Sequence, residues 1–356
     1  MKFSEYIQND AVGLAELVKK GEVTAKELAA LSFTRLQEVD KELNAVTQTR
    51  GAQVKEELEN INLDATFAGV PFYIKDISQT IAGEVSRGGS KLMAEAKAPQ
   101  TANLVNDFHR AGLLTLGYSA TPEFALKNIT EAAIHGPTRN PWNTNHSPGG
   151  SSGGAAALVA SGVTPIAGAS DGGGSIRIPA SFSGLFGLKP TRGRTSVGPG
   201  VGRQWQGAAI DFVLTRSVRD SATMLTELQV IQEEAAFQTP LFPDAYEQAM
   251  QADFDRPLKI GFTTESPVGT PVSDEAKLAV RKTVQWLEEQ GHHVEEANNK
   301  IDGKQLMRNY FLMNSGEISA LTQQIEGMLG RKLTAEDVEI ETWLLHCAGQ
   351  QVSAAD

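Results

Sequence analysis

The sequence lacks the features of three classes of protein: secreted proteins, membrane-spanning proteins, and proteins that bind nucleic acid or anionic membranes. It has one cysteine in 356 residues, so no internal disulfide can form and secretion gains no support. No apolar run approaches the roughly 20 residues of a membrane span, and the first residues contain no apolar run of signal-peptide length. Acidic residues outnumber basic ones by 43 to 32, a net charge of −11. A chain without a basic stripe is a poor nucleic-acid or anionic-membrane ligand. We therefore expect a cytoplasmic protein that binds neither, and a buried thiol at Cys347, which ends an apolar stretch.

The order of predicted helices and strands indicates an α/β fold. Residues 1–60 are expected to be helical, with Thr24 and Glu27 forming a capping box. The apolar run from Gly69 to Asp76 predicts a buried strand. Further strands are predicted at 113–116 and 163–167, and further helices at 102–111 and 155–160. Such alternation is typical of helices packed around a central sheet.

The last third of the chain predicts the same kind of structure. Ser217 and Asp220 can cap a helix that runs to Leu228. A βαβ-like unit follows, and residues 303–347 are predicted to be helical. In the βαβ-like unit, the expected strands are 258–262 and 293–296. The expected helix is 273–290, and Gly291 ends it.

The segment from about His135 to Gly207 is rich in small residues and contains two serine-bearing glycine turns. The first is Ser147–Gly154 (SPGGSSGG) and the second is Ser170–Arg177 (SDGGGSIR). Successive glycines leave backbone N–H groups free to point at one spot and hold an anion. If the serine after them attacks a carbonyl, those donors meet the developing oxyanion.

A serine hydroxyl needs a base to become a nucleophile, and Lys75 is the candidate that the sequence offers. None of the six histidines lies in a recognisable pattern with either turn. Residues 149–153 match G-x-S-x-G, but the polar, proline-broken segment before them excludes the strand that a nucleophile elbow needs. Lys75 ends an apolar strand, where desolvation favours the neutral amine. Taken singly, Ser175 could equally be a helix cap and Lys75 a solvated charge.

Several long motifs resemble the amidase signature family. They are Gly149–Gly154 (GGSSGG), Asp171–Pro179 (DGGGSIRIP) and Gly187–Thr191 (GLKPT), with Lys75 inside GVPFYIKD. The motifs stand in the family's order and at closely similar separations. The resemblance implies a twisted, mixed central β-sheet surrounded by α-helices, in a single amidase domain over 1–356. Its densest part is the signature core of about 69–228.

The resemblance further implies a Ser–cis-Ser–Lys triad that hydrolyses carboxylic amides through an acyl-enzyme. Ser175 would be the nucleophile, Ser151 the proton shuttle after a cis bond from Gly150, and Lys75 the base. N–H groups around Gly172, Gly173 and Gly174 would form the oxyanion hole. Supporting positions are Ser152, Ser170, Asp171 and Arg177. No metal or cofactor is implied; the partner would be a small-molecule amide, and homo-oligomers are compatible with the sequence.

Two other functions stay open at this point. An amidotransferase-type subunit of the same family would need partner subunits. A phosphate- or nucleotide-binding module has weak support, because the chain lacks both G-x-x-x-x-G-K-[ST] and a strand followed by G-x-G-x-x-G.

Substrate and length give two more expectations. Residues 171–175 and 205–211 are similar to family members that hydrolyse 6-aminohexanoate cyclic dimers. Family members run roughly a hundred residues longer, so the C-terminal part 258–356 is expected to lack their last segment and to expose a sheet edge or an apolar patch.

Overall fold

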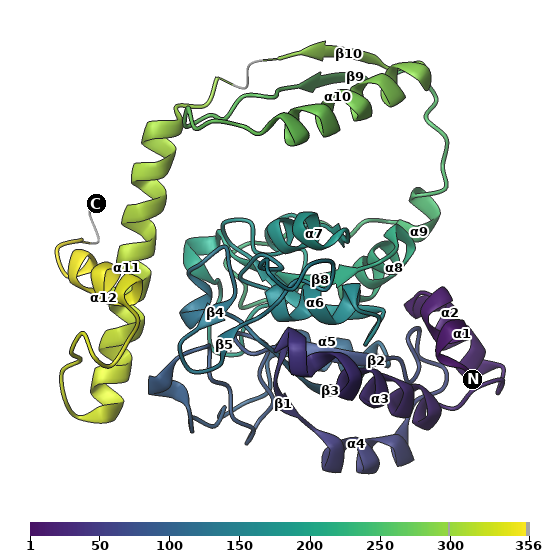
Figure 1. Ribbon diagram of the computed structural model, residues 1–356, viewed down its shortest axis with the longest axis horizontal. Helices are drawn as coiled ribbons and strands as arrows, with labels where there is room; N and C mark the ends of the chain where they lie inside the picture. The colour runs from purple at the N-terminus through teal and green to yellow at the C-terminus, as the bar shows by residue number, and fades with distance from the viewer. Residues whose placement is uncertain (298–299, 354–356) are drawn as a thin grey trace. The chain divides into compact units, whose positions relative to one another are not determined.

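The computed structural model describes residues 1–297 and 300–353, and its contacts divide the chain into two compact units (Figure 1). Unit 1 comprises Met1–Met250 and Leu321–Leu344, and unit 2 comprises Gln251–Ala320 and Leu345–Asp356. The sequence predicts a single domain, so this division is finer than expected. Among the described residues, no helix is both long enough and apolar enough to cross a membrane.

Unit 1 is built on two three-stranded sheets that adjoin along β2 and β6. The strand orders are β1-β3-β2 and β6-β8-β7, and β2 contacts β6. The pair β2–β3 is parallel, whereas β1–β3, β6–β8 and β7–β8 are antiparallel. The expected mixed α/β fold is therefore confirmed. The strands of unit 1 are β1 Val46–Thr49, β2 Pro71–Lys75, β3 Leu114–Ser119, β4 Glu131–Ala132, β5 Gly136–Pro137, β6 Ile166–Asp171, β7 Phe186–Gly187 and β8 Ile210–Thr215.

Helices pack against these sheets because their apolar faces need a partner. Figure 1 shows α6 and α7 beside β8 in the middle of unit 1, and α6 also contacts β2, β3 and β6. Phe72 of β2 packs edge-on against Phe108 of α5, with ring centroids 4.8 Å apart. The helices of unit 1 are α1 Phe3–Gln8, α2 Ala11–Lys19, α3 Ala25–Leu43, α4 Gly51–Glu57, α5 Asn103–Arg110, α6 Gly153–Ala160, α7 Arg177–Ser183, α8 Val218–Leu228 and α9 Tyr246–Ala249.

Strand β6 differs from its prediction in a way that matters for the site. The apolar pattern predicts a strand over 163–167, but β6 runs from Ile166 to Asp171. Its last residues pair with the start of β8, Ser170 with Asp211 and Asp171 with Ile210. Backbone pairing thus carries the strand into the polar residues, and the turn before Ser175 begins at Gly172.

The helix caps that the sequence predicts are confirmed. Thr24 accepts from the Glu27 N–H, and the Glu27 carboxylate accepts from the Thr24 N–H, which completes the capping box of α3. Ser217 caps α8 by accepting from the Asp220 N–H at 3.0 Å. These side chains satisfy N–H groups that the helix itself leaves unpaired.

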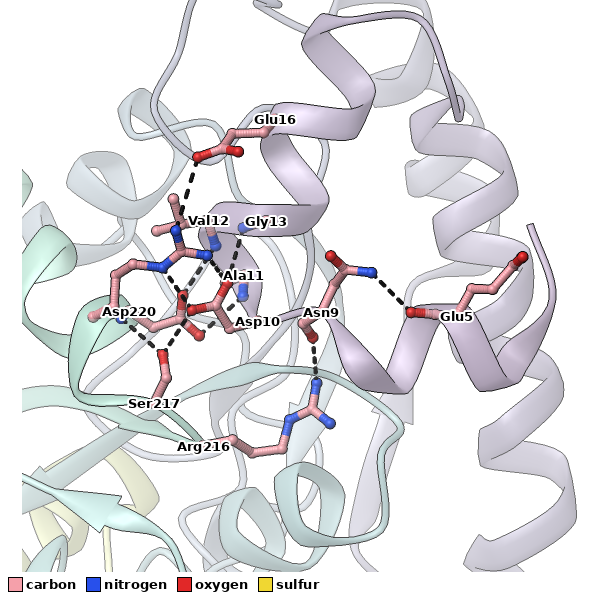
Figure 2. Close-up of polar contacts among 11 residues, drawn as sticks. Glu5, Asn9, Asp10, Ala11, Val12, Gly13, Glu16, Arg216, Ser217 and Asp220 are labelled. Atoms are coloured by element: carbon pink, nitrogen blue, oxygen red, sulfur yellow. Dashed lines mark hydrogen bonds and ion pairs between the residues drawn. The ribbon is translucent and has the colours of Figure 1, made fainter.

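The start of α2 is joined to the start of α8 by two acidic side chains (Figure 2). Buried Asp220 accepts hydrogen bonds from the N–H groups of Ala11 and Val12, both at 2.9 Å. Asp10 accepts from the Gly13 N–H at 2.9 Å and forms an ion pair with Arg219 at 2.5 Å. Between them, the two carboxylates satisfy the first three N–H groups of α2 and hold α2 against the start of α8.

Unit 2 confirms the predicted βαβ-like unit. Strands β9 (Lys259–Phe262) and β10 (His293–Glu296) are parallel and flank α10 (Asp274–Glu289) in sequence. Helices α11 (Gly303–Leu329) and α12 (Ile340–Gly349) span the boundary between the units. Large apolar side chains are exposed on α10 and α11: Leu278, Trp286, Leu306, Met307 and Phe311. Cys347 is exposed, so the prediction of a buried thiol is wrong: the apolar run forms a helix, and this position faces outward.

Candidate active site

Lys75, the last residue of β2, is fully buried and bonds to two serine hydroxyls. Its Nζ donates to Ser151 Oγ at 2.7 Å and to Ser170 Oγ at 2.8 Å. Burial lowers the pKa of Lys75 from its ordinary 10.5 to about 7, although the charges of Asp211 and Asp171 act in the opposite direction. A substantial share of Lys75 is therefore neutral near pH 7 and able to accept a proton.

Ser151 lies in a tight turn that places its hydroxyl against Lys75. The peptide bond between Gly150 and Ser151 is cis, as the family resemblance implies. Gly150 packs directly on the backbone of Ile129. A Cβ added at Gly150 would lie 2.7 Å from both the backbone nitrogen and the carbonyl oxygen of Ile129, so a larger residue does not fit there. Thr130 donates to the Gly149 carbonyl at 2.9 Å and accepts from the Gly153 N–H at 3.2 Å. Helix α6 starts at Gly153, so the turn is held on both sides.

The second glycine turn connects β6 to α7 and is shaped by Asp171. This buried carboxylate accepts from the N–H groups of Gly174 and Ile176, at 2.8 and 3.2 Å. It also forms an ion pair with Arg177, with Oδ1 and Nη2 2.8 Å apart. Burial alone would raise the pKa of Asp171, but the hydrogen bonds and charge of Arg177 lower it overall. Asp171 therefore stays ionised and holds the turn that carries Ser175.

The oxyanion-hole prediction needs one correction. The Gly174 N–H donates to Asp171, so it does not point at an oxyanion beside Ser175. Among the described residues, the N–H groups of Gly172, Gly173 and Ser175 have no acceptor. Gly174 instead allows the turn to form, because its φ of +126° is a backbone conformation that glycine adopts easily.

The two expected catalytic hydroxyls belong to turns that adjoin each other. Within residues 1–297 and 300–353, no hydrogen bond joins the hydroxyls of Ser151 and Ser175. The turns are linked through their backbones, since the Ser152 N–H donates to the Ser175 carbonyl at 3.3 Å. The Ser152 hydroxyl also bonds to the N–H and carbonyl of Ser170, both at 3.3 Å. Catalytic hydrogen bonds are often long in the absence of substrate.

Three residues near Lys75 were given no site role from the sequence, although Asp211 belongs to the segment 205–211 noted there. The Gln79 side chain accepts from the Lys75 N–H at 2.9 Å and donates to Asp211 at 3.2 Å. Ser78 donates to the same Asp211 oxygen at 2.7 Å. A signal existed for Asp211, because it is a single charge inside the apolar run Ala208–Leu214. Nothing in the sequence distinguishes Ser78 or Gln79 from ordinary loop residues.

A tryptophan lies beside the glycine turn that carries Ser175. A Cβ built on Gly172 would be 3.7 Å from Trp205 Cδ1. Trp205 and Gln206 both have positive φ, 51° and 52°, which is uncommon for bulky residues. The indole is half-buried and lies next to the free N–H groups of the turn.

The chain is similar to known proteins over most of its length. The sequence profile of the amidase family matches residues 27–352. The chain belongs to the amidase signature family. The lipoamidase of Enterococcus faecalis is 35% identical over 354 residues. The 6-aminohexanoate-cyclic-dimer hydrolase of Paenarthrobacter ureafaciens is 35% identical over 350 residues.

Both relatives are longer than this chain. The alignment covers 99% of the chain but 46% of the lipoamidase, and 97% of the chain but 70% of the Paenarthrobacter enzyme. A solved structure of 6-aminohexanoate cyclic dimer hydrolase complexed with substrate superposes with a TM-score of 0.91 at 33% identity. That match covers 98% of the chain and 73% of the solved one, so it includes both units.

Proposed function

We propose that the chain hydrolyses carboxylic amide C–N bonds outside peptides, through an acyl-enzyme on Ser175 with Ser151 and Lys75 as its proton path. The observation that carries the proposal is the buried contact between Lys75 Nζ and Ser151 Oγ, 2.7 Å long. A lysine with a pKa of about 7 can take the proton that a serine must lose to become a nucleophile.

In the proposed reaction, Ser175 Oγ attacks the amide carbonyl carbon. Its proton passes to Ser151 Oγ, while the Ser151 proton passes to Lys75 Nζ. The carbonyl oxygen becomes an oxyanion that the N–H groups of Gly172, Gly173 and Ser175 stabilise. Return of the proton through Ser151 to the departing nitrogen lets the C–N bond break and leaves an ester on Ser175. Water then attacks this ester by the same proton path, and the acid is released.

The 6-aminohexanoate-cyclic-dimer hydrolase among the relatives supports cyclic amides as one substrate class for this site, and the lipoamidase supports a wider range of amides. A panel of primary amides, linear secondary amides and cyclic lactam-like amides, with release of amine or acid as the readout, tests the proposal. Ser175→Ala protein is the control for contaminating activity. Glutamine belongs in the panel, because glutaminase activity alone would favour the amidotransferase-type alternative. Absence of turnover on every amide would contradict the proposal.

A further inference from the structure

Asp211 is a buried carboxyl group on the strand next to the candidate base. It is 4% exposed and is the second residue of β8, opposite Ser170 of β6. Directly opposed residues of neighbouring strands project to the same face of a sheet. Ser170 Oγ is 2.8 Å from Lys75 Nζ, so Asp211 lies on the face where the lysine amine is held.

Ser78 and Gln79, which follow Lys75 in the chain, both donate hydrogen bonds to this carboxyl group. Gln79 uses its carbonyl oxygen for the Lys75 N–H and its amide nitrogen for Asp211 and the Ala169 carbonyl, at 3.2 and 3.1 Å. Ser78, whose φ of 62° is rare for a residue with a side chain, donates to Asp211 at 2.7 Å. Donors that converge on a carboxyl group favour its ionised form, but burial outweighs them and raises the pKa of Asp211 above its ordinary value.

The other acidic groups near Lys75 are already engaged. Asp171 on β6 is neutralised by Arg177. Asp76 follows Lys75 directly, but its side chain accepts from Thr47 and from the Arg87 N–H, both at 2.9 Å. In the part of the chain that the structure describes, no arginine or lysine nitrogen, that of Lys75 included, lies within ion-pair distance of Asp211, so its charge acts on Lys75 over a longer range.

We propose that Asp211 is the counter-ion of protonated Lys75 and thereby sets the pH at which Lys75 becomes a base. It is a positioning residue, since it acts through Lys75 and not on the substrate. The negative charge favours the ammonium form, so removing it must make Lys75 lose its proton at lower pH. This inference rests on the proposed role of Lys75 in amide hydrolysis.

The test compares wild type with Asp211→Asn in two measurements. The first is kcat/KM against pH on an amide that the wild type hydrolyses. The second is the ¹³Cε chemical shift of Lys75 against pH, assigned by its loss in Lys75→Met and needing no substrate. We expect the acid limb of kcat/KM and the Lys75 titration both to move to lower pH, by about one pH unit or more. Unchanged positions of both curves would overturn the proposal.

Two further variants keep the test decisive. Asp76→Asn removes an equally buried carboxyl group beside Lys75 on the opposite side, so it should leave both curves in place. If Asp211→Asn does not fold, Asp211→Ser removes the same charge with a smaller side chain and must move both curves in the same direction. A failure of the proposed function appears differently: wild type would hydrolyse no amide, while the Lys75 titration would still report the effect of Asp211.

Discussion

Lys75 and Ser151 are 76 positions apart in the sequence, and their side chains meet at 2.7 Å in a fully buried contact. Strand β2 brings the amine to this point, and the turn at Gly150 brings the hydroxyl. Water is excluded on both sides, so the contact has the strength of a hydrogen bond in a medium of low dielectric constant. It is also where the mechanism makes its strictest demand, because a lysine can accept a proton only as a neutral amine.

Activity should rise with pH as Lys75 loses its proton. Its pKa is lowered to about 7, so the ammonium form dominates below that value and cannot act as a base. We expect kcat/KM to increase about tenfold per pH unit on the acid side and to level off above about pH 7.

Lys75→Arg should lose nearly all turnover at every usable pH, because a guanidinium stays protonated. Lys75→Met removes the amine but keeps nearly the length of the side chain and its apolar stem. Thermal melts of both variants check that they fold. Substantial turnover by the arginine variant would make Lys75 a structural cation.

Ser151→Ala should lower kcat by at least about a hundredfold, the scale on which positioned acid–base help acts. Only one oxygen is lost, so the fold should survive. Ser147→Ala makes the same change earlier in the loop and should have a small effect. If kcat of Ser151→Ala stayed within a factor of about three, the proton would reach Lys75 by another route.

Asp220→Asn should loosen the N-terminal helices. An asparagine has one carbonyl oxygen for two N–H groups, Ala11 and Val12, and leaving one of them unpaired costs about 1–3 kcal/mol of unfolding free energy. Urea unfolding of wild type and variant measures the difference. Glu16→Gln, an exposed neighbour of the same cluster, is the matched control and should change little.

The pH dependence of that difference has a definite sign. Burial raises the pKa of Asp220 from 3.8 to about 6, against the hydrogen bonds from Ala11 and Val12. The folded chain therefore binds more protons than the unfolded chain between these two pKa values. The contribution of this ionisation to stability is fully present below the lower value and is lost as pH rises through the higher one. The stability gap between wild type and Asp220→Asn should shrink over that interval; a gap that widens would contradict the assignment.

Local signals allowed much of the fold to be predicted from the sequence. The cap residues Thr24 and Ser217 act within one helical turn, so their partners are visible in the sequence. The apolar run before Lys75 also identifies a buried strand by itself. The contacts of Lys75 with Ser151 and Ser170 could be anticipated only because several separated motifs occur together.

The rest depends on contacts between distant segments. Strand β6 extends to Asp171 because β8 pairs with it, and no local pattern reports that partner. The Gly174 N–H turns toward Asp171, a choice that a glycine-rich sequence leaves open. The apolar stretch around Cys347 specifies a helix but not which of its faces is covered. Gln79 and Asp211 belong to the site through two hydrogen bonds of the Gln79 side chain, which connect the end of β2 to β8.

The most direct test of the proposed mechanism is to find which side chain becomes covalently modified. Intact protein is treated with a fluorophosphonate probe, and the labelled peptide is identified by mass spectrometry in wild type, Ser175→Ala and Ser183→Ala, the last a serine on the following helix. We expect one label on Ser175 in wild type and in Ser183→Ala, and loss of both labelling and amide turnover in Ser175→Ala. Labelling and turnover that persist at full strength in Ser175→Ala would contradict the mechanism.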